Sequence, residues 1–333
     1  MSDLAQAIDQ LAGEIGFSGA IRVDRGEQLE FVKAYGLADR AHEIANTIDT
    51  QFGIASGVKG LTALVIVSLI EDGTLALTTT ARSVLGDDLP LIADDVTVEH
   101  LLSHRSGIGD YIDEDAGGEV TEYVMPIPVH RLLNTEDFLA VLDGFPTKFA
   151  AGTQFSYCNG GFVVLALIAE RASGVPYHDL VDQRVCQPAG MVDAAFLRSD
   201  ELPGRAALGY LPIDGVSRTN LLHLPVRGNG DGGMYCTVAD MQSFWTALFA
   251  DRIVSADWLA EMVRPRSVNP EDSRRYGLGF WLHETSDQVM LDGYDAGASF
   301  RSAHDPTTGV TFTVVGNDCE GVWPMVKLLD AKV

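Results

Sequence analysis

Two short motifs in this 333-residue chain contain residue types suited to nucleophilic chemistry. In the first, Ser56 and Lys59 lie three residues apart in an otherwise apolar stretch, and on a helix this spacing places both side chains on one face. A serine hydroxyl becomes an effective nucleophile when a neighbouring base takes its proton. Burial lowers the pKa of a lysine, because the charged form loses its hydration. The motif therefore predicts a serine nucleophile with Lys59 as its base.

The second motif, Tyr157-Cys158-Asn159, directly precedes an apolar run with helical spacing. A tyrosine hydroxyl can relay protons, and an asparagine amide can hold both a lysine and a substrate carbonyl. Both motifs also have structural interpretations: Lys59 could extend its charged end to solvent, while Asn159 caps the helix and Tyr157 packs. The combination of the two motifs in this order is less expected by chance than either one alone.

The elements that must position these residues follow from hydrophobic periodicity and turn signals. Strand-like runs occur only near the two ends of the chain, whereas the centre has mainly helical patterns. The expected strands are 17–24, 28–36, 276–283, 298–304 and 309–317, and the expected helices are 3–15, 54–70, 96–104, 134–145, 161–174, 237–251 and 321–333. This order predicts an α/β domain whose antiparallel sheet, flanked by helices, is built from residues 1–75 and 240–333. Residues 76–239 form a mainly helical insertion domain.

The charge balance and the cysteine positions exclude several kinds of partner. The net charge of −24 opposes binding to nucleic acid or to an anionic membrane surface. The four cysteines are scattered without a metal-binding spacing, so we expect free thiols and no metal. Residues 1–17 resemble a surface helix rather than a signal peptide, and no apolar run is long enough to span a membrane. We therefore expect a cytoplasmic protein.

Together the two motifs resemble those of the serine β-lactamase and penicillin-binding-protein superfamily. The Tyr-x-Asn form is similar to that of class C β-lactamases, D-aminopeptidases, D,D-peptidases and family VIII carboxylesterases. Segments 97–111, 228–244 and 293–317 also resemble this superfamily, so the resemblance covers nearly the whole chain. It implies the β-lactamase/D,D-peptidase fold and an acyl-enzyme formed on Ser56 with the help of Lys59 and Tyr157. Asn159 would orient Lys59 and the substrate, and no cofactor is implied.

The chain departs from the superfamily at a third motif, where members carry a Lys or a His on a strand that lines the site. The comparable segment, 293–298, contains Asp295 and no cation. In penicillin-active members this cation helps to hold a substrate carboxylate, which Asp295 would disfavour. Strand alternation points Arg301 to the face opposite Ala298. Gly297 and Ala298 remain small enough for the strand to approach the substrate, and the Ala298 N–H would form an oxyanion hole with the Ser56 N–H.

We therefore expect a serine hydrolase that acts on small carboxylic esters or small amides. A D-amino-acid peptidase, a D,D-peptidase or a weak β-lactamase on the same scaffold is the alternative, and a non-catalytic ligand-binding homologue is another. Acyl transfer in place of hydrolysis and the oligomeric state stay open. His104 fits a structural role at a helix end, the acidic segment 110–119 fits a solvated loop near the cleft, and the glycine-rich segment 227–233 fits the mouth of the site.

Overall fold

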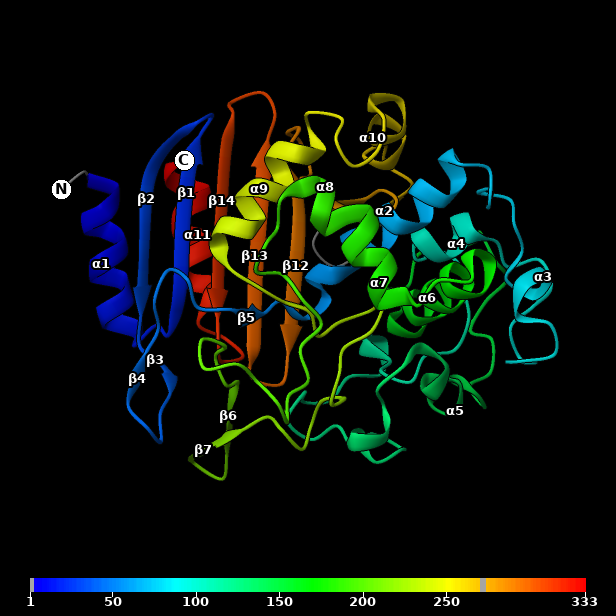
Figure 1. The fold of residues 1–333 in the computed structure, drawn as a ribbon, viewed down its shortest axis with the longest axis horizontal. Coiled ribbons are helices and arrows are strands. Elements are labelled where there is room, and N and C mark those ends of the chain that lie inside the picture. Colours follow the sequence, from blue (N-terminus) through cyan, green and yellow to red (C-terminus); the bar gives the residue numbers. More distant parts are fainter. Residues whose placement is uncertain (1–2, 270–273) are drawn as a thin grey trace.

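The computed structural model describes residues 3–269 and 274–333, and its central feature is an eight-stranded antiparallel sheet (Figure 1). The strands follow the order β2-β1-β14-β13-β12-β11-β10-β9. Their bounds in that order are Gln28–Tyr35, Gly19–Arg25, Val310–Gly316, Ala298–Asp305, Val289–Asp295, Trp281–Leu282, Arg275–Tyr276 and Ser267–Val268. Strand β1 pairs with β14 along its whole length, so the two ends of the chain share one sheet as predicted.

Helices cover both faces of this sheet, because alternate residues of its strands are apolar on both sides. Helices α1 (Asp3–Ile15) and α11 (Val322–Lys332) pack on one face, against side chains such as Val23 and Val314. On the other face, α9 (Val238–Leu248) and α2 (Val58–Glu71) contact the sheet, and Val315 belongs to that second core. The predicted fold class, an antiparallel sheet flanked by helices, is confirmed.

The region beyond the sheet is built around α6 (Asn159–Ser173), which packs directly against α2. Three shorter helices contact this pair: α3 Ala81–Leu85, α4 Val98–Leu102 and α7 Tyr177–Val181. Three further short helices are α5 Leu139–Leu142, α8 Gln187–Ala189 and α10 Ala256–Met262. Three small two-stranded sheets complete the chain: β3 Leu37–Asp39 with β4 Ile44–Ala45, β5 Phe52–Gly53 with β8 Tyr235–Cys236, and β6 Tyr210–Ile213 with β7 Val216–Thr219. The proposed boundaries of the helical domain, residues 76 and 239, remain a prediction.

Helix α2 occupies the boundary between the sheet and the helical region, and every residue from Val58 to Leu69 is buried. Its sequence is apolar all round rather than on one stripe, as expected of a helix enclosed on every side. Lys59 is the charged residue within this buried run. No helix in residues 3–269 and 274–333 is long and apolar enough to cross a membrane.

Candidate active site

Ser56 lies in a short 3-10 turn, Ala55–Gly57, that joins β5 to the start of α2. The turn is pressed against the sheet. A Cβ atom on Gly57 would lie 2.5 Å from the ring of Phe300, and one on Gly293 would lie 2.1 Å from the carbonyl oxygen of Ile54. Only glycine allows so close an approach, so β12 and β13 fix the position of the turn that carries Ser56.

Lys59 is 2 % exposed, and its Nζ atom lies within hydrogen-bond distance of three oxygens. These are Ser56 Oγ at 2.8 Å, Asn159 Oδ1 at 2.8 Å and the carbonyl oxygen of Asp231 at 2.7 Å. The amide and carbonyl oxygens of Asn159 and Asp231 can only accept hydrogen bonds. A neutral Lys59 amine would therefore direct its two N–H groups to them and its lone pair to the hydroxyl of Ser56.

The surroundings of Lys59 favour this neutral form. Burial lowers the pKa of Lys59, and the negative charges of Asp231, Glu114, Asp110 and Asp295 oppose that shift without cancelling it. None of the three oxygens that Nζ contacts belongs to a carboxylate. The site thus combines an amine of lowered pKa with a serine hydroxyl at hydrogen-bond distance, which is the arrangement required for a general base and its nucleophile.

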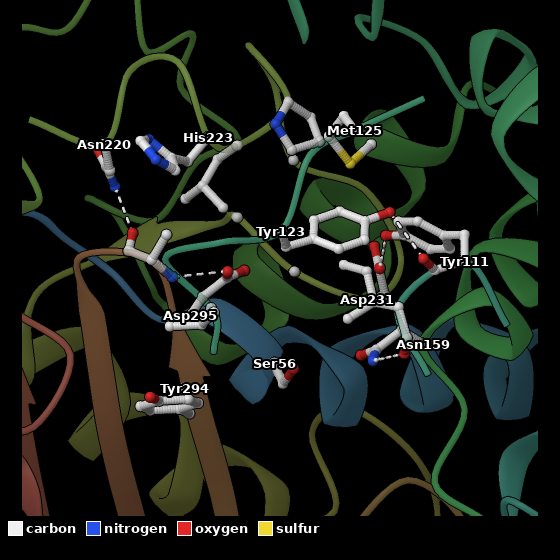
Figure 2. A pocket seen from close by; sticks show the side chains of 18 of the residues that line it. Ser56, Tyr111, Tyr123, Met125, Asn159, Asn220, His223, Asp231, Tyr294 and Asp295 are labelled. Atoms are coloured by element: carbon white, nitrogen blue, oxygen red, sulfur yellow. Dashed lines mark hydrogen bonds between the residues drawn. The ribbon is translucent and has the colours of Figure 1, made fainter. Parts of the chain in front are cut away.

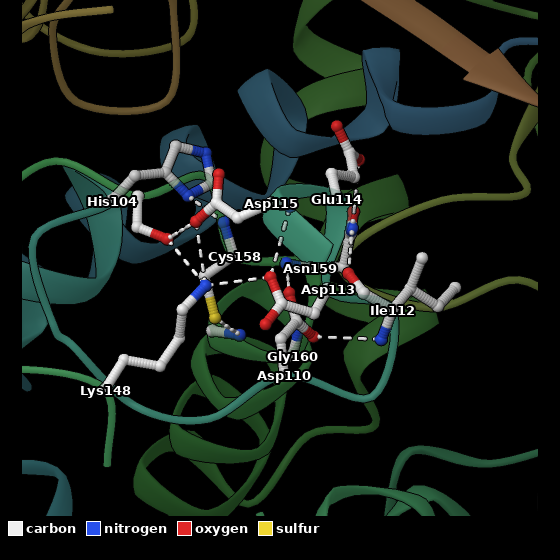
Figure 3. Close-up of polar contacts among 12 residues, drawn as sticks. His104, Asp110, Ile112, Asp113, Glu114, Asp115, Lys148, Cys158, Asn159 and Gly160 are labelled. Atoms are coloured by element: carbon white, nitrogen blue, oxygen red, sulfur yellow. Dashed lines mark hydrogen bonds and ion pairs between the residues drawn. The ribbon is translucent and has the colours of Figure 1, made fainter. Parts of the chain in front are cut away.

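The second motif lies at the start of α6, where Asp110 and Cys158 satisfy the free N–H groups of the helix. The carboxylate of Asp110 accepts from Asn159 N at 2.5 Å and from Gly160 N at 2.8 Å, and Cys158 Sγ accepts from Gly161 N at 3.3 Å (Figure 3). The side chain of Asn159 is therefore not needed as a cap. It instead contacts Lys59 and donates to Glu114 Oε1 at 3.1 Å.

Tyr157 is placed by aromatic packing. Its ring stacks on Trp281 at a centroid distance of 5.9 Å and lies 4.2 Å from the ring of His104, and Lys59 Nζ lies 5.0 Å from its centre. Burial raises the pKa of Tyr157, and a hydrogen bond with Ser56 opposes that shift only in part. The phenol is therefore protonated near neutral pH, and it is placed to donate or relay a proton at Ser56.

His104 has a structural position, as its sequence context suggested. It is 1 % exposed, its Nδ1 accepts from Cys158 N at 3.0 Å, and its ring packs among Phe155, Tyr157 and Tyr276. Burial lowers the pKa of His104 well below its usual value, so the ring is neutral and serves as an acceptor for the backbone before α6.

Sequence reasoning missed the roles of Asp231, Glu114 and Asp110, because these depend on long-range contacts that no hydrophobic period marks. Asp231 supplies the carbonyl oxygen that Lys59 contacts, and its carboxylate accepts from the hydroxyl of Tyr111. Glu114 reaches the amide of Asn159. The prediction of a solvated acidic loop at residues 110–119 was wrong at its start, because Asp110 is 5 % exposed and holds the N-terminus of α6. The prediction that segment 227–233 lines the mouth agrees with the structure.

A cavity of about 480 Å³ opens beside Ser56. Its volume is within the usual range for small-molecule sites. Figure 2 shows Asp295 on one side of Ser56, with Asp231 and Asn159 on the other. The cavity wall has four tyrosines and six carboxylates, and none of the described residues that form it is Lys or Arg. The tyrosines are Tyr111, Tyr123, Tyr235 and Tyr294, and the acids are Asp113, Glu114, Glu119, Glu122, Asp231 and Asp295.

The structure brings Asp295 to Ser56 but places Gly297 and Ala298 elsewhere. Both small residues line a smaller, adjoining cavity that shares Asp295 with the first and that Ser56 does not border, and the N–H of Gly297 donates to Cys319 Sγ at 3.2 Å. Asp295 and Ala298 flank a two-residue hairpin loop as a cross-strand pair. Arg301 pairs with Asp292 on the sheet and lies 6.0 Å from the ring of Trp323 in α11, on the face opposite Ser56.

The family model described as Beta-lactamase matches residues 4–330. The chain belongs to the beta-lactamase family. A penicillin binding protein from Bacillus halodurans has a similar structure, with a TM-score of 0.92 and 34% identity over 98% of this chain and 100% of that one. A D-amino acid amidase from Ochrobactrum anthropi gives a TM-score of 0.80 and 26% identity over 99% and 98% of the two chains.

Esterase EstB of Burkholderia gladioli is 33% identical over 213 residues, which are 62% of this chain and 54% of the esterase. The aligned part thus covers about half of that enzyme. The predicted superfamily is confirmed by these similarities, and so is the predicted class, a serine hydrolase. The similarities do not separate ester from amide substrates, because relatives of both kinds occur in this beta-lactamase family.

Proposed function

We propose that this member of the beta-lactamase family hydrolyses small carboxylic esters, or small amides, through an acyl-enzyme on Ser56. The observation that carries the proposal is the 2.8 Å contact between Lys59 Nζ and Ser56 Oγ, at the edge of a cavity of substrate size. Lys59 takes the hydroxyl proton while Oγ bonds to the substrate carbonyl. The tetrahedral adduct then expels the alcohol or amine, which takes up a proton from Lys59 by way of Tyr157.

Hydrolysis of the acyl-enzyme repeats these steps with water. Neutral Lys59 removes a proton from the water, the water oxygen bonds to the acyl carbon, and Ser56 Oγ leaves with the returned proton. Asn159 keeps the Lys59 amine directed at Ser56 throughout. Tyr157 is a relay rather than a base in this scheme, because burial keeps its phenol protonated.

The register of β12 and β13 favours the N–H of Tyr294, not that of Ala298, as the second oxyanion donor. Residues that flank a two-residue hairpin loop normally bond to each other, so the Ala298 N–H is directed to Asp295. Tyr294 and Ser299 then form the next, non-bonded pair, and the Tyr294 N–H points away from β13. Tyr294 also lines the cavity with Ser56, whose own N–H lies in the first helical turn.

The test is steady-state turnover of p-nitrophenyl butyrate and of a chromogenic cephalosporin by the wild type, Ser56→Ala and the control Ser83→Ala. We expect Ser56→Ala to lose ester turnover by roughly 10⁴-fold, because nucleophile and base act as one unit. Ser83 is an exposed residue of α3, so its variant should match the wild type. Ester turnover that survives in Ser56→Ala would contradict the proposal. Faster cleavage of the cephalosporin than of the ester would favour a β-lactamase.

Amide hydrolysis is the second candidate, because the similarity to a D-amino acid amidase extends over almost the whole chain. Amides have poorer leaving groups than esters, so the proton that Tyr157 relays to the departing nitrogen matters more for them. Tyr157→Phe should therefore slow an amide such as D-phenylalanine amide more than it slows a p-nitrophenyl ester. Equal losses on both substrates would argue against Tyr157 as the relay.

A further inference from the structure

The charges around Ser56 do not balance. The carboxylates of Asp231, Glu114 and Asp295 all act on Lys59, and none of the described residues that line the cavity is Lys or Arg. None of the ion pairs found among the described residues involves these three acids. The negative charge of these three acids is therefore not compensated by an ion pair among the described residues, which is costly in a partly enclosed space. A positively charged ligand would relieve this repulsion.

Asp295 is the acid best placed to meet such a ligand. It lies at the end of β12, beside Ser56, and the hydrogen bond found for its carboxylate comes from its neighbour Ala296 N at 2.8 Å. The other acids of the inner cavity have closer partners: Asp231 accepts from Tyr111, and Glu114 accepts from Asn159. The carboxylate of Asp295 therefore retains the most capacity for a substrate group.

Two further features of the cavity bear on the cationic group and on the carbonyl of such a ligand, respectively. The rings of Tyr111, Tyr123 and Tyr294 line the wall, and aromatic faces combined with carboxylates are the surroundings that bind alkylammonium groups. Asn229, which is 1 % exposed and also lines the cavity, has an amide nitrogen, Nδ2, without a hydrogen-bond partner among the described residues. This donor suits the carbonyl of a bound ester or amide.

We propose that the cavity selects substrates that carry an ammonium group, and that Asp295 is the counter-ion of that group. This inference rests on the proposed hydrolase function, because the selected molecule is the ester or amide that acylates Ser56. Glu114 and Asp231 add to the negative field, and the tyrosine rings enclose the alkyl part of the cation. A substrate with a carboxylate at the same place would be rejected by the same field.

The test uses pairs of esters that differ only in charge. Choline butyrate is compared with 3,3-dimethylbutyl butyrate, and p-nitrophenyl 4-(trimethylammonio)butyrate with p-nitrophenyl 5,5-dimethylhexanoate. In each pair a quaternary nitrogen replaces a quaternary carbon, so size is constant and the charge does not titrate. We expect the cationic member of at least one pair to have about a ten-fold higher kcat/KM at pH 8.

Asp295→Asn should reduce this cation-to-neutral ratio to about two, since Glu114 and Asp231 remain. Glu27→Gln is the matched control: it removes one negative charge on the exposed turn between β1 and β2, and the ratio should stay at the wild-type value. A ratio near one in both pairs of the wild type would overturn the inference. So would a ten-fold ratio that Asp295→Asn leaves intact.

Failure of the inference can be distinguished from failure of the proposed function. Hydrolysis of the neutral esters that depends on Ser56, without a preference for the cations, would keep the function and overturn the inference. If no ester is hydrolysed, calorimetry of the same four esters with Ser56→Ala still measures the preference. Tighter binding of a cationic ester by about ten-fold supports the inference in that case, and equal affinities within each pair overturn it.

Discussion

Two lysines of this protein, Lys59 and Lys148, each contact a serine hydroxyl, and their surroundings differ in kind. Lys59 is buried, and its other two contacts are neutral oxygens. Lys148 has a side chain that is 25 % exposed, and it contacts Asp113 and Asp115 at 2.8 Å each and Ser156 Oγ at 3.0 Å (Figure 3). The two lysines thus have the same number of polar contacts, but Lys148 contacts two carboxylates directly and Lys59 contacts none.

The difference shows in their pKa values. Burial lowers the pKa of Lys59, and no carboxylate contacts its Nζ directly. Partial burial also acts to lower the pKa of Lys148, but the hydrogen bonds that Lys148 donates to Asp113 and Asp115 outweigh it and raise the pKa above its usual value. A serine beside a lysine is therefore not enough to make a base. The base arises where the remaining partners of the amine are neutral and water is excluded.

The largest expected effect is that of Lys59→Met, which removes the amine and keeps the length of the side chain. We expect kcat/KM for p-nitrophenyl butyrate to fall by roughly 10³-fold or more, because a general base typically contributes 10²–10⁴. The matched variant Lys148→Met should retain at least about half of the wild-type value. Equal losses of kcat/KM in the two variants would show that the different surroundings of the two lysines do not determine which one acts as the base.

The next effect comes from giving Lys59 a carboxylate like those around Lys148. In Asn159→Asp the new negative charge favours the ammonium form and raises the pKa of Lys59. Lys59 then becomes a free base only at higher pH, so the acid limb of the kcat/KM profile should move upward by about one pH unit or more. Activity at pH 7 should fall by roughly ten-fold or more and recover in part at pH 9. If kcat/KM instead fell by the same factor at every pH, the substitution would have displaced Lys59 from Ser56 and not raised its pKa.

Much of this arrangement can be predicted from the sequence where periodic patterns or caps are present. The strands β1, β2, β13 and β14 largely coincide with the strand-like runs of the sequence, and α9 begins directly after Thr237, whose side chain accepts from Asp240 N. The pair Ser56 and Lys59 is also local, because three residues of one helical turn bring them together.

The parts of the site that could not be predicted depend on long-range contacts or on a one-residue difference in strand register. Asp231 approaches Lys59 through a loop 172 residues away in sequence, and no local pattern marks its carbonyl as a partner. The choice between Ala298 and Tyr294 as oxyanion donor depends on where the hairpin turns, since neighbouring residues of a strand direct their N–H groups to opposite sides. A resemblance between motifs does not fix that register.

A smaller effect, the pH dependence of the preference for a cationic ester, should distinguish Asp295 from the other acids of the cavity. Burial raises the pKa of Asp295 to about 7, with Asp231 and Glu114 adding to the shift and Lys59 opposing it. Its carboxyl group therefore loses its proton as the pH rises through 7. The preference for a trimethylammonio ester over its neutral isostere should increase about five-fold between pH 6 and pH 8.

The quaternary nitrogen does not titrate, and the ratio of two substrates cancels changes in the protonation of Lys59 that affect both. His223 also lines the cavity, and Figure 2 shows it beside Asn220 on the same side of the view as Asp295. Two variants separate these contributions: Asp295→Asn should flatten the dependence of the ratio on pH, and His223→Gln should leave it in place. A flat ratio in the wild type would mean that the carboxylate of Asp295 does not meet the cation.

The smallest expected effect concerns the stability contributed by Lys148. Its ion pairs with Asp113 and Asp115, together with its hydrogen bond to Ser156 Oγ, join the acidic loop to the segment before α6. Partly exposed pairs of this kind contribute little, so Lys148→Met should lower the free energy of unfolding by about 1 kcal/mol or less. Urea denaturation measures this change, and 0.5 M salt should reduce it by screening. A loss of several kcal/mol would instead show that this lysine holds the wall of the cavity in place.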